Sequence, residues 1–331
     1  MSTADWMRQI PDTKWLRQIV LPGSHDAGVY GTAQTITRGV PGFLSNPKNS
    51  IVCQHSDFGR QAMAGSRFFD CRVFLRKTTD AATGAKVTEQ KLGHFFKEKV
   101  PLSKQPAMGG YGGALTAVVG QALDFVIANP SEFIILRFSH TYHPTECVNA
   151  IRHVIAGNPA YPGALYTQTG NIATKTIGSL RGRVIMVFDE KFNHHITPGQ
   201  GIHRFKKFSA DAEHIDGLAT CGAFASSSDI SKVHADTLRA VAKHRTDHLG
   251  TPGHLHFIYW QQTGGDVYKN TTAPTKEGKQ WSGGAHSVLG DFLHELWLQS
   301  TEAVKPANVI SHDFVTADTC SKIIRLNPEC H

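Results

Sequence analysis

The sequence contains no apolar run of about 18 residues, so no segment is long enough to cross a membrane as a helix. Residues 1–15 lack the apolar core of a secretory leader, and we expect no classical signal peptide. Internal repeats and low-complexity tracts are missing, which excludes repeat proteins and disordered linkers. The six cysteines are widely spaced without a CxxC pair, which argues against a zinc finger or disulfide framework and favours reduced thiols.

The composition is typical of a globular protein. Apolar residues make up 40% of the 331 positions and charged residues only 18%, which argues against a disordered or coiled-coil chain. The 34 Lys and Arg exceed the 27 Asp and Glu, and the net charge of +7 favours anionic partners. The only dense basic cluster is Arg204, Lys206 and Lys207. No nucleic-acid-binding motif accompanies it, so nucleic acid is not an expected partner.

Apolar, β-rich segments alternate with helical patterns, which is typical of βα units around a parallel sheet. We predict strands at residues 18–21, 67–75, 91–94, 133–138, 183–188, 255–260 and 308–311, with an eighth within 201–208. Apolar spacing predicts helices at 115–127, 288–297 and 318–325, and the polar stretch 263–284 is expected to form a surface loop. The sequence therefore predicts an α/β fold, a distorted TIM-type (β/α)8 barrel forming a single domain over residues 1–331.

In a barrel of this kind the active site lies at the C-terminal ends of the strands. Reactive side chains stand at four predicted strand ends: His25 and Asp26, then Asp70 and Arg72, then His94, and finally Asp313. Asp70 and Arg72 are two positions apart, so in one strand they face the same side and can neutralise each other. Taken alone, these two could be a core ion pair without a catalytic role. Their convergence with the other residues favours an active site.

Two segments carry a specific resemblance to a known family. Residues 6–28 read WMRQIPDTKWLRQIVLPGSHDAG, and residues 61–72 read QAMAGSRFFDCR. Both resemble the X-domain of phosphatidylinositol-specific phospholipase C, with its I-P-G-[ST]-H-[DN]-[SA]-G and G-x-R-x-[FL]-D-x-R motifs. Weaker matches follow in the same order, namely NPSEFIILRFSH, LRGRVIMVF and NVISHDF. Residues 191–249 contain no motif of the family.

The resemblance implies a phosphodiesterase that cleaves phosphatidylinositol to diacylglycerol and inositol 1,2-cyclic phosphate by general acid–base catalysis. His25 would be the general base, and Asp313 would hydrogen-bond to it and fix its tautomer. His94 would be the general acid. Two imidazoles suit this chemistry near neutral pH, because one removes the proton of the inositol 2-hydroxyl and the other protonates the leaving oxygen.

The same resemblance assigns three further residues. Arg72 would stabilise the charge that develops on a phosphate oxygen, and Asp26 would orient Arg72. Asp70 would hold His94 or Arg72. A guanidinium at this position repels a divalent ion, so the sequence resembles the metal-independent bacterial branch, and we expect no metal and no cofactor. His94 departs from the family pattern, in which the second histidine often precedes a glycine, so another residue could be the acid.

Arg137, Lys191 and Tyr259, near predicted strand ends, are candidate contacts to the lipid headgroup. The expected partner is a phosphatidylinositol-containing membrane surface, bound transiently by a monomer. The implied activity favours a location outside the cell. Two alternatives stay open. One is a barrel phosphodiesterase acting on another phospholipid or a GPI-type glycolipid, and the other is a non-catalytic lipid-binding barrel.

Other residue clusters in the sequence give weaker signals of a site. The histidine pairs 140 and 143, 194 and 195, and 254 and 256 each supply half of a zinc site, but no further ligands stand at a suitable spacing. A serine-hydrolase elbow is missing, because no G-x-S-x-G segment occurs. The glycines of residues 109–113 are predicted to form a flexible loop before a helix rather than a phosphate site.

Overall fold

The computed structural model describes residues 2–31, 34–37, 49–95, 108–141, 143–197, 199–207, 215–222, 224–248, 253–300 and 305–331. Within these residues, eight parallel strands form a closed barrel in the order β1-β12-β11-β10-β9-β8-β7-β3. The barrel strands are β1 (Leu21–Ser24), β3 (Phe68–Cys71), β7 (Phe133–Phe138), β8 (Arg183–Phe188), β9 (Ile202–Lys207), β10 (Gly217–Cys221), β11 (His254–Tyr259) and β12 (Val309–His312). The predicted (β/α)8 fold is therefore confirmed.

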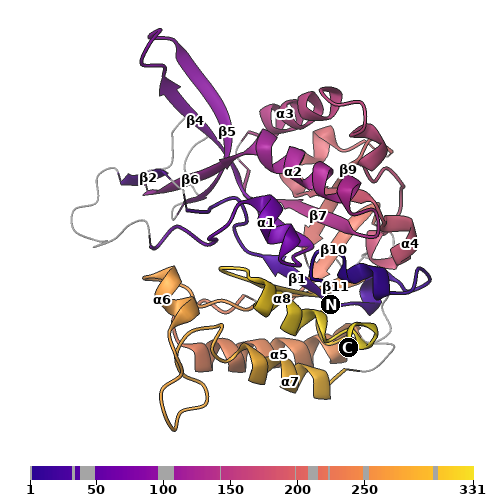
Figure 1. Cartoon of the computed structure of the whole chain (residues 1–331), viewed down its shortest axis with the longest axis vertical. Helices are drawn as coiled ribbons and strands as arrows, with labels where there is room; N and C mark the ends of the chain where they lie inside the picture. Colours follow the sequence, from indigo (N-terminus) through magenta and orange to yellow (C-terminus); the bar gives the residue numbers. More distant parts are fainter. Residues whose placement is uncertain are drawn as a thin grey trace.

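Helices cover the outside of the barrel. They are α1 (Phe58–Met63), α2 (Leu115–Ala128), α3 (Pro144–Ala156), α4 (Ile177–Leu180), α5 (Ile230–His248), α6 (Val267–Thr272), α7 (Leu289–Leu298) and α8 (Ala317–Ile324). In Figure 1, α2 and α3 lie on one side of the molecule and α5, α7 and α8 on the other. Between β8 and β9 the described residues form the 3-10 helix Glu190–His195 where a regular barrel has an α-helix, which is one source of its distortion.

A second, antiparallel sheet lies beside the barrel with the strand order β2-β6-β5-β4. Its strands are β2 (Gln34–Thr37), β4 (Val73–Thr79), β5 (Lys86–Phe95) and β6 (Met108–Ala114). The β4–β5 hairpin projects away from the rest of the molecule (Figure 1). The predicted strand at 67–75 is thus two strands, because the chain leaves the barrel at Arg72 and enters the second sheet at Val73.

The number of barrel strands was predicted correctly, but one segment predicted to be a barrel strand lies outside the barrel. Segment 91–94 belongs to β5 in the second sheet, whereas the barrel strand β10 lies where no strand was predicted. The first strand begins at Leu21 rather than at Gln18, which ends a 3-10 helix. It also extends beyond residue 21, the predicted end, because Pro22 and Gly23 both pair with β12. The eighth predicted strand is β9, which ends at Lys207; Phe208 lies outside the described residues.

The predicted helices are confirmed to within about one residue as α2, α7 and α8. The predicted loop at 263–284 contains α6, whose N-terminus is capped by Asp266. The glycine-rich segment before α2 is strand β6 rather than a loop. It needs small residues because a Cβ at Gly112 would lie 1.9 Å from the carbonyl oxygen of Gly28, next to the predicted site. The six cysteines are free thiols, as expected.

The barrel wall contains a fully buried ion pair between Arg67 and Glu132. The Nη2 and Nε atoms of Arg67 lie 2.7 and 2.9 Å from Oε2 of Glu132. The other N–H groups of the guanidinium donate to backbone carbonyls, including that of Ala62 at 2.7 Å and that of Ala4 at 2.7 Å. This arginine therefore ties the N-terminal segment to α1 and to the turn before β7.

Candidate functional site

The pair His25 and Asp313 forms the centre of the site. His25 follows β1 and Asp313 follows β12, and these strands pair in parallel with Ser24 opposite His312. The next residue of each strand therefore emerges at the same point of the barrel mouth. The Nδ1 atom of His25 lies 2.8 Å from Oδ1 of Asp313, and both side chains are buried. This geometry fits the hydrogen bond that the sequence predicted.

Gln54 forms hydrogen bonds to both of the loops that carry His25 and Asp313. Its amide nitrogen donates to the carbonyl oxygens of His25 at 2.9 Å and of His312 at 3.3 Å. Its amide oxygen accepts the N–H of Val315 at 2.9 Å. The side chain is fully buried, so the contacts are shielded from water. Gln54 therefore fixes the backbone of the loop that carries His25 relative to the loop that carries Asp313.

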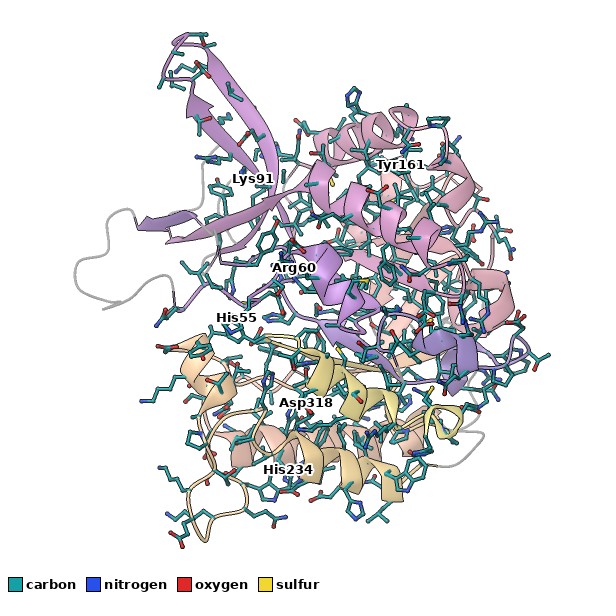
Figure 2. All side chains as sticks on the ribbon, in the orientation of Figure 1. His55, Arg60, Lys91, Tyr161, His234 and Asp318 are labelled. Atoms are coloured by element: carbon teal, nitrogen blue, oxygen red, sulfur yellow. The ribbon has the colours of Figure 1, made fainter. Side chains whose placement is uncertain are left out.

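The backbone beside the pair adopts an unusual conformation. Asp26 and Phe314, which follow His25 and Asp313, have φ angles of 42° and 50°. Left-handed angles in non-glycine residues cost free energy and often occur at functional sites. The ring of Phe314 packs at 4.5 Å on that of His55, which Figure 2 labels in the segment before α1. The packing holds the loop in the conformation that directs Asp313 toward His25.

Arg72 connects the two buried carboxylates of Asp26 and Asp70. Its Nε lies 2.8 Å from Oδ1 of Asp26, and its Nη2 lies 3.1 Å from Oδ2 of Asp70. The same Nη2 lies 3.2 Å from Nε2 of His25. Burial alone would raise the pKa of Asp70, but the guanidinium groups of Arg72 and Arg137 lower it to about 2. Arg72 likewise lowers the pKa of Asp26 against the effect of burial. Both carboxylates are therefore ionised at neutral pH, and they fix the orientation of Arg72.

His94 reaches the site from the antiparallel sheet beside the barrel. It lies on β5 of the antiparallel sheet, not on a barrel strand as predicted. Its Nδ1 is 2.9 Å from Oδ2 of Asp26, and its ring centroid lies 6.4 Å from that of His25. The two histidines thus meet in one site. Of the two partners proposed for Asp70, the structure gives it Arg72, while Asp26 contacts His94.

The charges around His25 determine its protonation. Burial acts to lower the pKa of His25, but the carboxylates of Asp26 and Asp313 outweigh burial and the nearby charge of Arg72, so the pKa is raised above 6.5. Arg72 donates hydrogen bonds and cannot accept them. Its contact with Nε2 therefore requires a lone pair there, with the proton on Nδ1 facing Asp313. This is the tautomer that a general base needs.

A cavity of about 600 Å³ opens in front of these residues. Its lining includes His25, Arg72, His94 and Asp313 together with residues 226–228 and 261–265. Sequence reasoning missed three contacts here. Gln261 lies 3.3 Å from Nε2 of His25, Cys53 lies 3.5 Å from Nδ1 of His94, and Ser139 donates to Asp70 at 3.0 Å. Gln261 and Ser139 follow strands and could have been found by that position, whereas nothing in the sequence marks Cys53.

A second cavity of about 560 Å³ lies at the ends of β7, β8 and β9. Arg137 and Lys191, two predicted headgroup contacts, line it. The third, Tyr259, accepts a hydrogen bond from Nη1 of Arg137 at 2.6 Å. The same Nη1 lies 3.7 Å from Oδ1 of Asp70, so this cavity is connected through ion pairs to Arg72. The structure therefore places Arg137 and Lys191 in one cavity and Tyr259 in contact with Arg137.

Three sets of side chains around the site have ligand atoms within 4.8 Å of one another. They are His25, Cys53 and Asp313; Asp26, Cys53 and His94; and His25, Asp26 and Asp70. Arg72 already neutralises two of the carboxylates, Asp26 and Asp70, which disfavours a divalent cation there. Within the residues that the structure describes, none of the histidine pairs considered as half-sites belongs to such a set. Metal independence stays a prediction.

Comparisons with known proteins find similar sequences and similar folds. No model of a known protein family matches the chain. Two proteins named 1-phosphatidylinositol phosphodiesterase, from Staphylococcus aureus strains Newman and NCTC 8325 / PS 47, are each 25% identical to it over 209 residues, or 60% of this chain. The alignments cover 55% and 52% of these relatives, so the chain spans about half the length of the curated relatives it matches.

Solved structures resemble the chain over nearly its whole length. The phosphatidylinositol-specific phospholipase C of Listeria monocytogenes superposes with a TM-score of 0.61 at 16% identity, covering 99% of both chains. That of S. aureus, from work on the modulation of its membrane binding, gives a TM-score of 0.58 at 19% identity and covers 98% of each chain. These likenesses show the shared barrel fold. With the sequence relatives, they confirm the family resemblance carried by the motifs.

Proposed function

We propose, from its relationship to the bacterial phosphatidylinositol-specific phospholipases C, that this chain cleaves phosphatidylinositol to diacylglycerol and inositol 1,2-cyclic phosphate without a metal. The observation that carries the proposal is the buried pair of His25 and Asp313, with Arg72 at the opposite ring nitrogen of His25. A base held in one tautomer beside a guanidinium is suited to a reaction that removes a proton and develops charge on phosphate.

The first step would be deprotonation of the inositol 2-hydroxyl by Nε2 of His25. The hydroxyl oxygen would attack the phosphorus of the same molecule, so attacker and target are already tethered. The bond from phosphorus to the glycerol oxygen would break as the cyclic diester forms. Asp313 would stabilise the resulting imidazolium through its hydrogen bond to Nδ1, which measures 2.8 Å.

His94 would protonate the departing diacylglycerol oxygen. Asp26 accepts at Nδ1 of His94 through one carboxylate oxygen and pairs with Arg72 through the other, so it positions both groups. Arg72 would bind a non-bridging phosphate oxygen and stabilise the negative charge of the transition state. Its two carboxylate partners hold it in place before the substrate arrives, which avoids reorganisation during the reaction.

Arg137, Lys191 and Tyr259 would bind the hydroxyls of the inositol ring. The substrate would be taken from a phosphatidylinositol-containing membrane surface, bound peripherally and transiently. In the part of the chain that the structure describes, no helix is both long and apolar enough to span a bilayer. Because one chain supplies every proposed catalytic group, we expect the protein to act as a monomer.

The direct test is phosphorus NMR of the purified protein with phosphatidylinositol micelles in EDTA. We expect the signal of inositol 1,2-cyclic phosphate to appear under these conditions. Turnover that requires added Ca²⁺ would contradict metal independence. If phosphatidylinositol is not cleaved, the same assay with other phospholipids and GPI-type glycolipids distinguishes a different phosphodiesterase from a lipid-binding barrel without activity.

The pH profile gives a second prediction. A general base works only when it is unprotonated, so activity falls as the pH drops through its pKa. The pKa of His25 is raised above 6.5, so the acid limb of kcat/KM should lie above pH 6.5. The carboxylates responsible are buried, and moderate salt should therefore leave the limb in place. An acid limb below pH 6.5, or one that moves with salt, would contradict this assignment.

A further inference from the structure

Cys53 lies in the proposed site but has no part in the proposed reaction. Its thiol is buried, and the residue lines the cavity of about 600 Å³ together with His94. The Sγ atom lies 3.5 Å from Nδ1 of His94 and 3.8 Å from Oδ2 of Asp26. These atoms of His94 and Asp26 are themselves 2.9 Å apart. A thiol, an imidazole and a carboxylate therefore place one ligand atom each around a common point.

The three distances fit the edges of a tetrahedral zinc site. Zinc bonds of about 2.3 Å to sulfur and about 2.0–2.1 Å to nitrogen and oxygen imply separations of about 3.6, 3.5 and 3.3 Å for the sulfur–nitrogen, sulfur–oxygen and nitrogen–oxygen pairs. The distances in the structure differ from these values by about 0.4 Å or less. A water molecule from the cavity can supply the fourth ligand. Small movements of the side chains are thus enough to enclose the ion.

Arg72 opposes a hard cation at this point more than it opposes zinc. Its Nε contacts Oδ1 of Asp26, whereas Oδ2 is the oxygen that faces His94. Calcium and magnesium depend on oxygen ligands, and the guanidinium neutralises the carboxylate that would supply them. Zinc also bonds to sulfur and nitrogen, and the thiolate of Cys53 adds a second negative charge. The site therefore selects a borderline-soft divalent cation.

The neighbouring set of His25, Cys53 and Asp313 is less suited to a metal. The Nδ1 atom of His25 faces Asp313, and a metal bound there would leave the ring proton on Nε2. Arg72 donates to Nε2 from 3.2 Å, so two donors would then face each other. Binding at Nε2 instead would bring the cation against the guanidinium itself. The set that contains His94 is therefore the favoured one.

We propose that Asp26, Cys53 and His94 bind Zn²⁺ and that the bound ion inhibits the enzyme. The inhibition rests on the proposed function, because it regulates the same site, whereas the binding does not. Zinc replaces the thiol proton, which passes to solvent, and takes the lone pair of Nδ1 of His94. The ring of His94 is then neutral and no longer acts as an imidazolium toward the leaving oxygen. Removal of the zinc restores the acid.

Spectroscopy with Co²⁺, used in place of Zn²⁺, tests the binding without an assay of activity. We expect metal-free protein to bind one Co²⁺ with a thiolate-to-metal charge-transfer band, and Zn²⁺ to displace it. Cys53→Ser should lose the band and weaken Zn²⁺ binding in calorimetry by about 100-fold or more, because even the outer partners of metal ligands contribute about 10- to 100-fold.

Cys221→Ser is the matched control. Cys221 is also buried, and its Sγ lies 3.0 Å from Nδ1 of His244. Within the described residues, however, this pair belongs to no set of three ligands. The control variant should therefore keep the band and the wild-type affinity for Zn²⁺.

Inhibition is measured by phosphorus NMR as the rate of phosphatidylinositol cleavage at buffered free Zn²⁺, divided by the rate of the same protein in EDTA. At a free Zn²⁺ concentration of about ten times the Kd, only about a tenth of the wild-type molecules remain metal-free. The wild-type ratio should therefore fall about 10-fold, whereas the ratio for Cys53→Ser should stay near one.

The outcomes separate this inference from the proposed function. Equal Zn²⁺ affinity in wild type and Cys53→Ser, or loss of the band in Cys221→Ser instead, overturns the inference. If Cys53→Ser does not fold, His94→Gln replaces a less buried ligand, and unchanged affinity in that variant overturns the inference. Zinc binding without inhibition overturns the regulatory role. Failure of the metal-free wild type to cleave phosphatidylinositol contradicts the proposed function, while the Co²⁺ spectrum still decides the metal site.

Discussion

Replacing His25 with alanine is expected to lower kcat/KM for phosphatidylinositol by about 10²- to 10⁴-fold, the typical contribution of a general base. The imidazole is the group that Asp313 and Arg72 approach from opposite sides, at 2.8 and 3.2 Å. Its removal leaves the inositol hydroxyl without a positioned proton acceptor. The cyclic phosphate signal in phosphorus NMR measures the loss directly.

The control must separate lost chemistry from lost folding. His25 is buried, and alanine leaves the carboxylate of Asp313 without its imidazole partner. His25→Gln keeps an N–H donor near that carboxylate but supplies no base, so it should be folded and equally inactive. Added imidazole should restore part of the activity of His25→Ala. Activity within 10-fold of wild type in both folded variants would show that another group is the base.

The second large effect concerns stability. Replacing Glu132 with alanine should lower the free energy of unfolding by about 3–5 kcal/mol, because Arg67 would remain charged and buried without its partner. Urea unfolding followed by circular dichroism measures the change as a shift of the midpoint. Burial of the charge, not the loss of packing alone, is the expected cause.

A double variant tests that cause. Arg67→Met combined with Glu132→Leu removes both charges, and replacing a buried pair by apolar residues is often close to neutral. The double variant should therefore be more stable than Glu132→Ala. It should not reach wild-type stability, because the carbonyls of Ala62 and Ala4 lose their donors. A loss below about 1 kcal/mol in the single variant would mean that water or another group compensates Arg67.

The sequence predicted barrel strands best where their composition was distinctive. β7 and β8 match the predicted bounds because FIILRF and RVIMVF are near-continuous apolar runs bounded by polar residues. β10 reads GLATC, and such short, small side chains give no clear period. β5 has strand character, but periodicity cannot distinguish a barrel strand from one of a neighbouring sheet. The error therefore concerned which strands pair, which is a property of the tertiary structure.

The site was predicted from residues that follow strands. The pairing of His25 with Asp313 was implied by the family resemblance, and the structure brings the two side chains together because the first and last strands of the closed barrel are neighbours. His94 was expected in the site and lies there, although its strand belongs to the second sheet. Gln54 and Cys53 were missed because they lie in an irregular segment whose position is set by contacts with the loops after β1 and β12. Such contacts have no signature in a single sequence.

The pairing of β1 with β12, which closes the barrel, affects the order in which the protein folds. The hydrogen-bonded residues His25 and Asp313 are 288 positions apart in the chain. Contacts of such long range form late because the intervening chain must be ordered first. A nascent chain still held at its last strand cannot assemble the pair, so the proposed activity would require release of that strand. Catalytic activity in a refolding experiment would correspondingly report closure of the barrel rather than formation of its helices.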